Sequence, residues 1–251
     1  YYEEYSEHLV ALVKTVREKT GIDLYAVSLQ NEPQFNEPYA SCVVGPEEYR
    51  DLLRVVGPRF RAEGLSTRFF LPEALPQQKA IDRYIRTIAA DPVASQYLDI
   101  VAIHNYDADG IKVGGPGAAE WAAMYGWAQE NRSTKTWMSE TSGHADDWTG
   151  AETLAGNIYN ALHAGNASAW IFWSFNVTPD AAAFGLLNNG TETARYAVST
   201  QFYRFIRPGM VRVEAQSDQE DLLVLGFVAG NNPTAKADAT AQSRGTGGAA
   251  T

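Results

Sequence analysis

Two glutamates in this chain stand where a carboxyl group can do chemistry. Glu32 closes an apolar run that begins at Tyr25, and Glu140 closes another that begins at Lys135. Such runs are typical of buried β-strands, and each delivers its carboxylate to the end of the strand where (β/α) barrels carry their functional groups. Two carboxyl groups that face one cleft are the minimum requirement for breaking a glycosidic bond, one as the acid and the other as nucleophile or base.

The residues beside Glu32 fit this chemistry. Asn31 supplies a donor and an acceptor for a sugar hydroxyl, and Pro33 fixes the backbone after the carboxylate. A general acid must be held neutral near its working pH by its surroundings, so we expect this of Glu32. The alternatives are a surface glutamate in a turn for Glu32 and a cap of the next helix for Glu140.

The elements that must position these residues alternate between strand and helix. The strands are nearly continuous apolar runs, as expected for a parallel sheet covered on both faces by helices. The predicted strands are 24–29, 67–71, 98–104, 136–139 and 168–174, and the predicted helices are 2–19, 45–63, 81–89, 118–131 and 152–164. A closed barrel needs eight strands, so the pattern predicts an α/β fold, a (β/α)8 TIM barrel that lacks strands one to three.

The pattern changes towards the C-terminus. Residues 196–207 are predicted to form the last barrel helix, ended by Pro208 and Gly209, and 210–215 and 222–228 two antiparallel strands. Residues 230–251 consist mainly of Ala, Thr, Gly and Ser, which is typical of a flexible tail. We therefore expect a partial barrel over 1–207, the first strands of a second domain over 208–229, and a tail over 230–251.

Several motifs together resemble glycoside hydrolase family 30, in the clan of retaining (β/α)8 glycosidases. The resemblance spans roughly residues 1–229 and rests on Asn31-Glu32-Pro33, His104-Asn-Tyr106, Trp170-Ile-Phe-Trp173-Ser174 and Phe202-Tyr-Arg-Phe-Ile-Arg-Pro208-Gly209. It implies that Glu32 is the acid/base and Glu140 the nucleophile. It also implies that residues 208–229 begin the C-terminal half of a side β-sandwich.

The resemblance further implies double displacement with retention, which needs carboxyl groups about 5–5.5 Å apart, whereas inversion needs about 6.5–9.5 Å. The implied substrate is a β-linked glycan such as xylan or a β-1,6-linked galactan or glucan. Glucuronoxylan specialists of the family use an Arg-containing loop after strand eight, but residues 176–193 contain no Arg or Lys, which favours neutral substrates. The alternatives are a glycan-binding or inactive barrel fragment, and another clan member with the same glutamate pair but a different substrate.

Further residues are predicted to contact the substrate. Asn31 is expected to bind the 2-hydroxyl, and Trp173 to stack on a sugar. His104 and Tyr106 are expected to line the cleft and orient Glu140. For His104 and Trp173 the alternative is a place in the core. The remaining candidates are Glu73, for which a loop role is the alternative, and the loop aromatics Trp148, Tyr39 and Phe175.

Composition restricts the partners. A net charge of -10 and a pI near 4.9 argue against nucleic acid, which requires clustered Lys and Arg, and fit an uncharged oligo- or polysaccharide. The single cysteine, Cys42, allows no intrachain disulfide, and no apolar run reaches the roughly 20 residues of a membrane span.

We expect no cofactor and no metal. Asp107-Ala-Asp109-Gly110 resembles a calcium loop, but Ala118 stands where the bidentate glutamate should be. The four histidines lack ligand spacing. The family resemblance implies secretion, and we expect the complete protein to be a monomer.

Overall fold

The computed structural model describes residues 1–75, 80–106, 116–132, 134–219 and 222–230. Contacts divide the chain into two compact units, residues 1–198 and 199–251, which are described separately. The calcium-like motif Asp107–Gly110 and residues 231–251 of the predicted tail lie outside the described residues.

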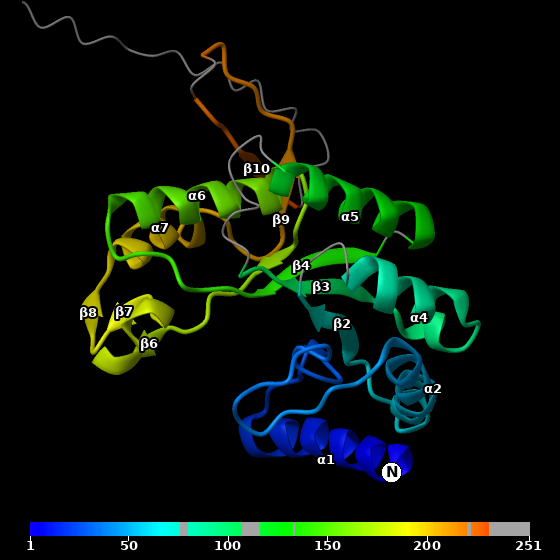
Figure 1. Cartoon of the computed structure of the whole chain (residues 1–251). Helices are drawn as coiled ribbons and strands as arrows, with labels where there is room; N and C mark the ends of the chain where they lie inside the picture. Colours follow the sequence, from blue (N-terminus) through cyan, green and yellow to red (C-terminus); the bar gives the residue numbers. More distant parts are fainter. Residues whose placement is uncertain (76–79, 107–115, 133, 220–221, 231–251) are drawn as a thin grey trace, which may run out of the picture. The chain divides into compact units, whose positions relative to one another are not determined.

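A parallel sheet forms the centre of the first unit (Figure 1). Its five strands pair in chain order, each parallel to the next. They are β1 (Ala26–Val27), β2 (Arg68–Ala74), β3 (Ile100–His104), β4 (Lys135–Glu140) and β5 (Ala169–Trp170). Because all the strands run in one direction, their carboxyl ends meet at one edge of the sheet, and side chains that end different strands can meet there.

Helices connect the strands and lie outside the sheet (Figure 1). This arrangement confirms the predicted alternation of strand and helix. The helical segments are α1 (Tyr2–Thr20), α2 (Pro46–Ala62), the π-helical turn η1 (Ala80–Ile85), α4 (Arg86–Ala90), the 3-10 turn η2 (Ala94–Tyr97), α5 (Pro116–Arg132) and α6 (Trp148–His163).

Local chemistry sets the ends of these helices. Gly21 ends α1 with a left-handed φ of 73°, a conformation that glycine adopts without steric cost. Pro46 begins α2, and the Glu48 carboxylate accepts a hydrogen bond of 2.8 Å from the Gly45 amide. Asp147 caps α6 by accepting a 2.8 Å hydrogen bond from the Gly150 amide. Asp147, rather than Glu140, therefore caps this helix.

The hydrophobic core lies between the sheet and the helices. Every residue of β3 is buried, as expected for an inner strand with both faces covered. Apolar side chains from the helices and strands pack in one cluster that includes Leu9, Val13, Leu53, Val56, Ile88, Val101, Ile103 and Met138.

Some element bounds differ from the prediction. The predicted strands 24–29 and 168–174 shorten to β1 and β5, although the Ile171 and Trp173 amides still bond to Met138 and Thr141 of the neighbouring chain segment. The predicted helix 81–89 is divided between η1 and α4. Hydrophobic periodicity does not show where a strand stops pairing with its neighbour. The predicted and observed strands therefore differ at their ends.

Residues 176–193, predicted as a loop, contain a small sheet of three short strands. These are β6 (Asn176–Val177), β7 (Leu187–Asn188) and β8 (Thr191–Glu192), with the 3-10 turn η4 (Pro179–Phe184) between the first two. Strands of two residues carry no readable period, which is why the sequence did not indicate them.

The C-terminal region begins with α7 (Ala194–Tyr203), which ends earlier than the predicted helix 196–207. Pro208, which has no amide hydrogen, and Gly209, with a φ of 86°, then turn the chain. In the second unit β9 (Met210–Val213) pairs antiparallel with β10 (Gly226–Ala229). The two predicted antiparallel strands are confirmed, and both are shorter than the sequence indicated.

Candidate active site

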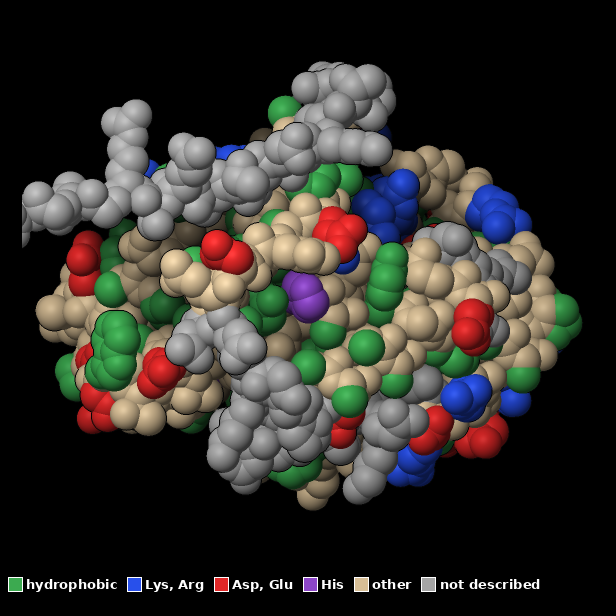
Figure 2. All heavy atoms as spheres, turned by 90° about the horizontal axis from the view of Figure 1, so that it is seen from above, with side chains coloured by type: hydrophobic (Ala, Val, Ile, Leu, Met, Phe, Trp, Pro, Cys, Tyr) green, Lys and Arg blue, Asp and Glu red, His purple; other side chains and the backbone are tan. Residues whose placement is uncertain are grey.

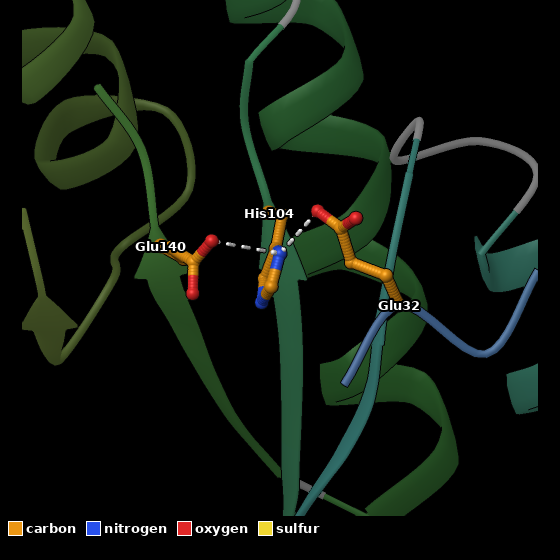
Figure 3. A group of neighbouring side chains, drawn as sticks. All are labelled: Glu32, His104 and Glu140. Atoms are coloured by element: carbon orange, nitrogen blue, oxygen red, sulfur yellow. Dashed lines mark hydrogen bonds and ion pairs between the residues drawn. The ribbon is translucent and has the colours of Figure 1, made fainter. Parts of the chain in front are cut away.

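Polar side chains gather at the carboxyl ends of the strands. Glu140 is the last residue of β4, His104 is the last of β3, and Glu73 precedes the last residue of β2. Glu32 follows β1 after a short segment. Glu32, His104 and Glu140 point towards one another (Figure 3). Together with Glu73, which contacts His104, and Tyr106, which contacts Glu140, they form the strand-end cluster.

His104 lies at the centre of the strand-end cluster and is 1% exposed. Its Nδ1 is 2.8 Å from Glu32 Oε1, and its Nε2 is 3.3 Å from Glu73 Oε1. Glu140 Oε1 lies 3.7 Å from Nδ1. Burial lowers the pKa of His104, but the hydrogen bonds to Glu32 and Glu73 and the charge of Glu140 outweigh it and raise the pKa to about 9. At neutral pH the ring is therefore charged and donates from both nitrogens.

Glu32 is buried, with 6% of its surface exposed, and its backbone has a left-handed φ of 42°. Such a conformation is uncommon for a residue other than glycine and is concentrated at functional sites. The Glu32 amide donates to the Glu73 carbonyl at 3.1 Å, and the Glu32 carbonyl accepts from the Phe35 amide at 2.9 Å. These bonds fix the carboxylate above the strand ends.

The proton affinity of Glu32 differs from the expectation. The hydrogen bond from His104 lowers the pKa of Glu32, and this effect is stronger than burial, which raises it. The expectation that the surroundings hold this carboxyl neutral is therefore wrong for the substrate-free site. The physical reason is the imidazolium of His104, which stabilises the charged carboxylate.

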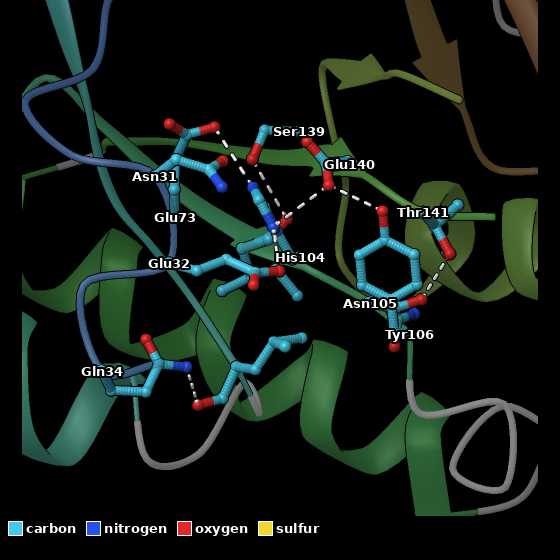
Figure 4. Close-up of polar contacts among 12 residues, drawn as sticks. Asn31, Glu32, Gln34, Glu73, His104, Asn105, Tyr106, Ser139, Glu140 and Thr141 are labelled. Atoms are coloured by element: carbon cyan, nitrogen blue, oxygen red, sulfur yellow. Dashed lines mark hydrogen bonds and ion pairs between the residues drawn. The ribbon is translucent and has the colours of Figure 1, made fainter. Parts of the chain in front are cut away.

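Glu140 is held from the side of β3. The Tyr106 hydroxyl donates to Glu140 Oε1 at 2.6 Å, and the Asn105 amide donates to the Glu140 carbonyl at 3.0 Å. The Thr141 hydroxyl donates to the Asn105 carbonyl (Figure 4). Burial, followed by the contact with Glu140, raises the pKa of Tyr106, so the phenol stays protonated and remains a donor.

The carboxylates are close together. One donor atom each from Glu32, His104 and Glu140 lies within 4.8 Å of the other two. This spacing would also suit a metal ion, but a doubly protonated imidazole has no lone pair to offer a metal. The imidazolium of His104 offsets one of the negative charges of the carboxylates around it.

The structure places the other predicted residues around or away from the strand-end cluster. Asn31 is exposed next to Glu32, and Trp173, 54% exposed, follows β5. Trp148 is 81% exposed and begins α6 rather than lying on a loop; Phe175 is 64% exposed. Within the described residues, no side-chain hydrogen bond or ring contact joins these aromatic residues to the strand-end cluster.

Glu37 is a site residue that the sequence analysis missed. The neighbouring Glu32 carboxylate is the main cause of the raised pKa of Glu37. Glu37 in turn raises the pKa of Tyr39, which places this predicted aromatic near the site. The available signal was a second acidic residue, followed by tyrosine, in the loop after Glu32.

Known proteins resemble this chain in sequence and in fold. No protein-family model matches the chain. The chain is 26% identical over 238 residues to the glucuronoxylanase XynC of Bacillus subtilis strain 168, which covers 92% of this chain and 50% of the relative. It is similar to the structure of a GH30 endoxylanase from Clostridium papyrosolvens C71, with a TM-score of 0.73 and 26% identity, covering 90% of this chain and 53% of that chain. It is also similar to the structure of the family 30 subfamily 8 xylanase Xyn30A from Clostridium acetobutylicum, with a TM-score of 0.73 and 27% identity. That match covers 92% of this chain and 54% of the xylanase chain.

The chain fits the C-terminal part of a glycoside hydrolase family 30 catalytic domain. The family 30 resemblance is confirmed, and the parallel sheet with its outer helices is a fragment of an α/β barrel. The chain spans about half the length of the family 30 relatives it matches. Within the described residues, no helix is long and apolar enough to cross a bilayer.

Proposed function

We propose that this protein is a retaining glycoside hydrolase that cleaves β-linked glycans with Glu32 and Glu140. The observation that carries the proposal is the meeting of two carboxyl groups, from different strand ends, with oxygens within 4.8 Å of each other. This closeness favours the short carboxyl separation of retaining enzymes, about 5–5.5 Å, over the long separation of inverting ones.

Each carboxylate has one role in each half of the reaction. Glu140 attacks the anomeric carbon while Glu32 protonates the leaving oxygen, and water then cleaves the glycosyl-enzyme with Glu32 as base. Tyr106 orients Glu140 by its hydrogen bond of 2.6 Å. His104 holds Glu32 at 2.8 Å on the other side.

The lowered pKa of Glu32 suits the second half of the reaction, which needs a carboxylate as base. The first half needs a proton on the same group. Entry of a sugar removes water from Glu32, and loss of hydration favours the neutral form of a carboxyl group. Substrate binding therefore raises the proton affinity of Glu32 in the Michaelis complex.

We propose a neutral β-linked backbone, such as that of xylan, as the substrate. The family 30 relatives are xylanases, and the segment 176–193 has no Arg or Lys to bind an acidic branch. On the face shown in Figure 2, acidic and basic side chains are interspersed with hydrophobic ones. The exposed rings of Trp173, Phe175 and Trp148 offer flat apolar surfaces on which sugars stack. Asn31, which is exposed beside Glu32, binds a hydroxyl of the sugar.

The resemblance to family 30 also supports three proposals about the complete protein. β9 and β10 begin a side β-sandwich, and the complete protein acts as a monomer. It acts outside the cell, because a polysaccharide is too large to enter one.

The test is hydrolysis of a panel of β-glycans by the full-length protein, with Glu32→Gln and Glu140→Gln as variants. The panel contains neutral xylan, glucuronic-acid-substituted xylan and β-1,6-linked glucan and galactan. We expect cleavage of a neutral glycan and loss of at least about 1000-fold in kcat for each variant, the scale on which essential catalytic groups act. Binding of glycans by a folded protein without any hydrolysis would instead support a glycan-binding function.

A further inference from the structure

Glu73 occupies the side of His104 that faces away from Glu32. Its Oε1 lies 3.3 Å from Nε2, while Nδ1 bonds to Glu32 at 2.8 Å (Figure 4). Glu73 is 8% exposed. The ring is thus enclosed between two carboxylates that approach opposite nitrogens.

The backbone is built to place Glu73 there. Its φ of 58° lies in the left-handed region, and the register between β2 and β3 shifts between Pro72 and Ala74. An irregularity of this kind re-aims a side chain at the end of a strand. The Glu73 carbonyl also accepts the Glu32 amide at 3.1 Å, so one distorted residue positions both groups that flank His104.

The two contacts decide where the protons are. Ionised carboxylates only accept hydrogen bonds, so His104 must carry a proton on each nitrogen to satisfy both Glu32 and Glu73. Among the described residues, the other titratable groups near the ring are Glu140, whose Oε1 is 3.7 Å from Nδ1, and Tyr106, whose ring centroid is 6.2 Å away. Glu37 also acts on Glu32 and contributes to its lowered pKa. Glu73 is the partner of the nitrogen that points away from the two proposed catalytic glutamates.

We propose that Glu73 is a positioning residue that keeps His104 doubly protonated and thereby sets the proton affinity of Glu32, rather than a residue that contacts the sugar. This inference rests on the proposed function of Glu32 as acid/base. In the resting site the imidazolium holds Glu32 as a carboxylate, the form that acts as base in the second half of the reaction.

Removal of the Glu73 charge is expected to weaken the preference of Glu32 for the carboxylate form. In Glu73→Gln the amide oxygen still accepts the Nε2 proton, but the ring loses one of the three carboxylates around it, while Glu32 and Glu140 remain. The pKa of His104 therefore falls, and a larger share of the rings is neutral. In a neutral ring Nδ1 presents a lone pair to Glu32, which favours the protonated carboxyl. We expect the alkaline limb of the kcat/KM profile to move to higher pH by about one unit, since a nearby charge shifts a pKa by about 1–3 units.

The experiment uses the full-length protein with three variants. Glu73→Gln is expected to shift the alkaline limb with little change in KM, whereas Glu73→Asp, which keeps the charge, is expected to restore much of the wild-type profile. Glu152→Gln, which removes an exposed carboxylate on α6, serves as the matched control and is expected to leave the profile unchanged. An unchanged pH profile with a raised KM in Glu73→Gln would overturn the proposal in favour of a sugar contact.

A second measurement tests the inference without activity. The 15N shifts of the His104 ring in the wild-type protein are expected to show two protonated nitrogens at pH 7. A neutral His104 ring at pH 7 would refute the inference, even if Glu73→Gln does not fold. Failure of all glycans to be hydrolysed, with a charged His104 ring, would refute the proposed function alone.

Discussion

The proposed nucleophile and the proposed acid/base receive different partners from the same strand end. Glu140 accepts a neutral hydroxyl from Tyr106 at 2.6 Å, whereas Glu32 accepts a charged donor, His104, at 2.8 Å. A neutral donor orients a carboxylate and still leaves it nucleophilic. A charged donor mainly controls whether a carboxyl group holds a proton.

Tyr106→Phe removes the hydrogen bond to Glu140 and keeps the aromatic ring. A hydrogen bond to a charged group contributes about 1.5–3 kcal/mol, so we expect kcat/KM to fall by about 10-fold to 150-fold. Unaltered kcat/KM in a folded Tyr106→Phe protein would show that this contact does not orient the nucleophile.

His104 makes stability depend on pH at the alkaline side. Folding raises its pKa from 6.5 to about 9, so its contribution to stability is complete below pH 6.5 and is lost as pH rises through 9. We expect the stability difference between wild type and His104→Asn to shrink by on the order of 3 kcal/mol across this window. Denaturant unfolding at a series of pH values measures it, and a difference that stays constant with pH would contradict the charged state of the ring.

At the scale of elements, one buried cation joins the loops that follow β4 and β5. Arg195, in the first turn of α7, is 1% exposed. Its guanidinium donates to the carbonyls of Gly185, His144 and Ala182 at 2.7 to 2.8 Å. The Gly143 amide adds a bond of 3.1 Å to the Ala183 carbonyl. This network fixes the chain that follows Glu140.

Arg195→Met keeps the apolar stem but removes all three donations. Each buried carbonyl left without a partner costs about 1–3 kcal/mol, so we expect the unfolding free energy to fall by at least about 3 kcal/mol. Arg17→Met, at an arginine that is 69% exposed, is the control and should change stability by less than about 1 kcal/mol. Equal stability of the two variants would show that the network does not hold these loops.

The sequence predicts some features of these elements and not others. The apolar runs located the strands and their order, because burial on both faces leaves a continuous pattern. The ends of β1 and β5, the bulge at Glu73 and the short strands within 176–193 were not indicated, because pairing with distant segments determines them. Glu32 and Glu140 were found from their position after apolar runs. The lowered pKa of Glu32 could not be predicted from the sequence, since its main cause, His104, comes from another strand.

At the scale of the whole molecule, the chain contributes the proposed catalytic pair from one continuous sheet. Its alignment covers about nine-tenths of this chain and about half of each family 30 relative. The net charge of -10 and the absence of Lys and Arg from residues 176–193 favour neutral glycans as substrates.

The most direct test of the central claim is trapping of the glycosyl-enzyme. The full-length protein would be incubated with an activated 2-deoxy-2-fluoro glycoside of the sugar that it cleaves, digested, and examined by mass spectrometry. We predict one glycosyl unit bound to the peptide that contains Glu140, and none in Glu140→Gln. A glycosyl unit on a different residue, or hydrolysis with inverted anomeric configuration and no trapped sugar, would contradict the account.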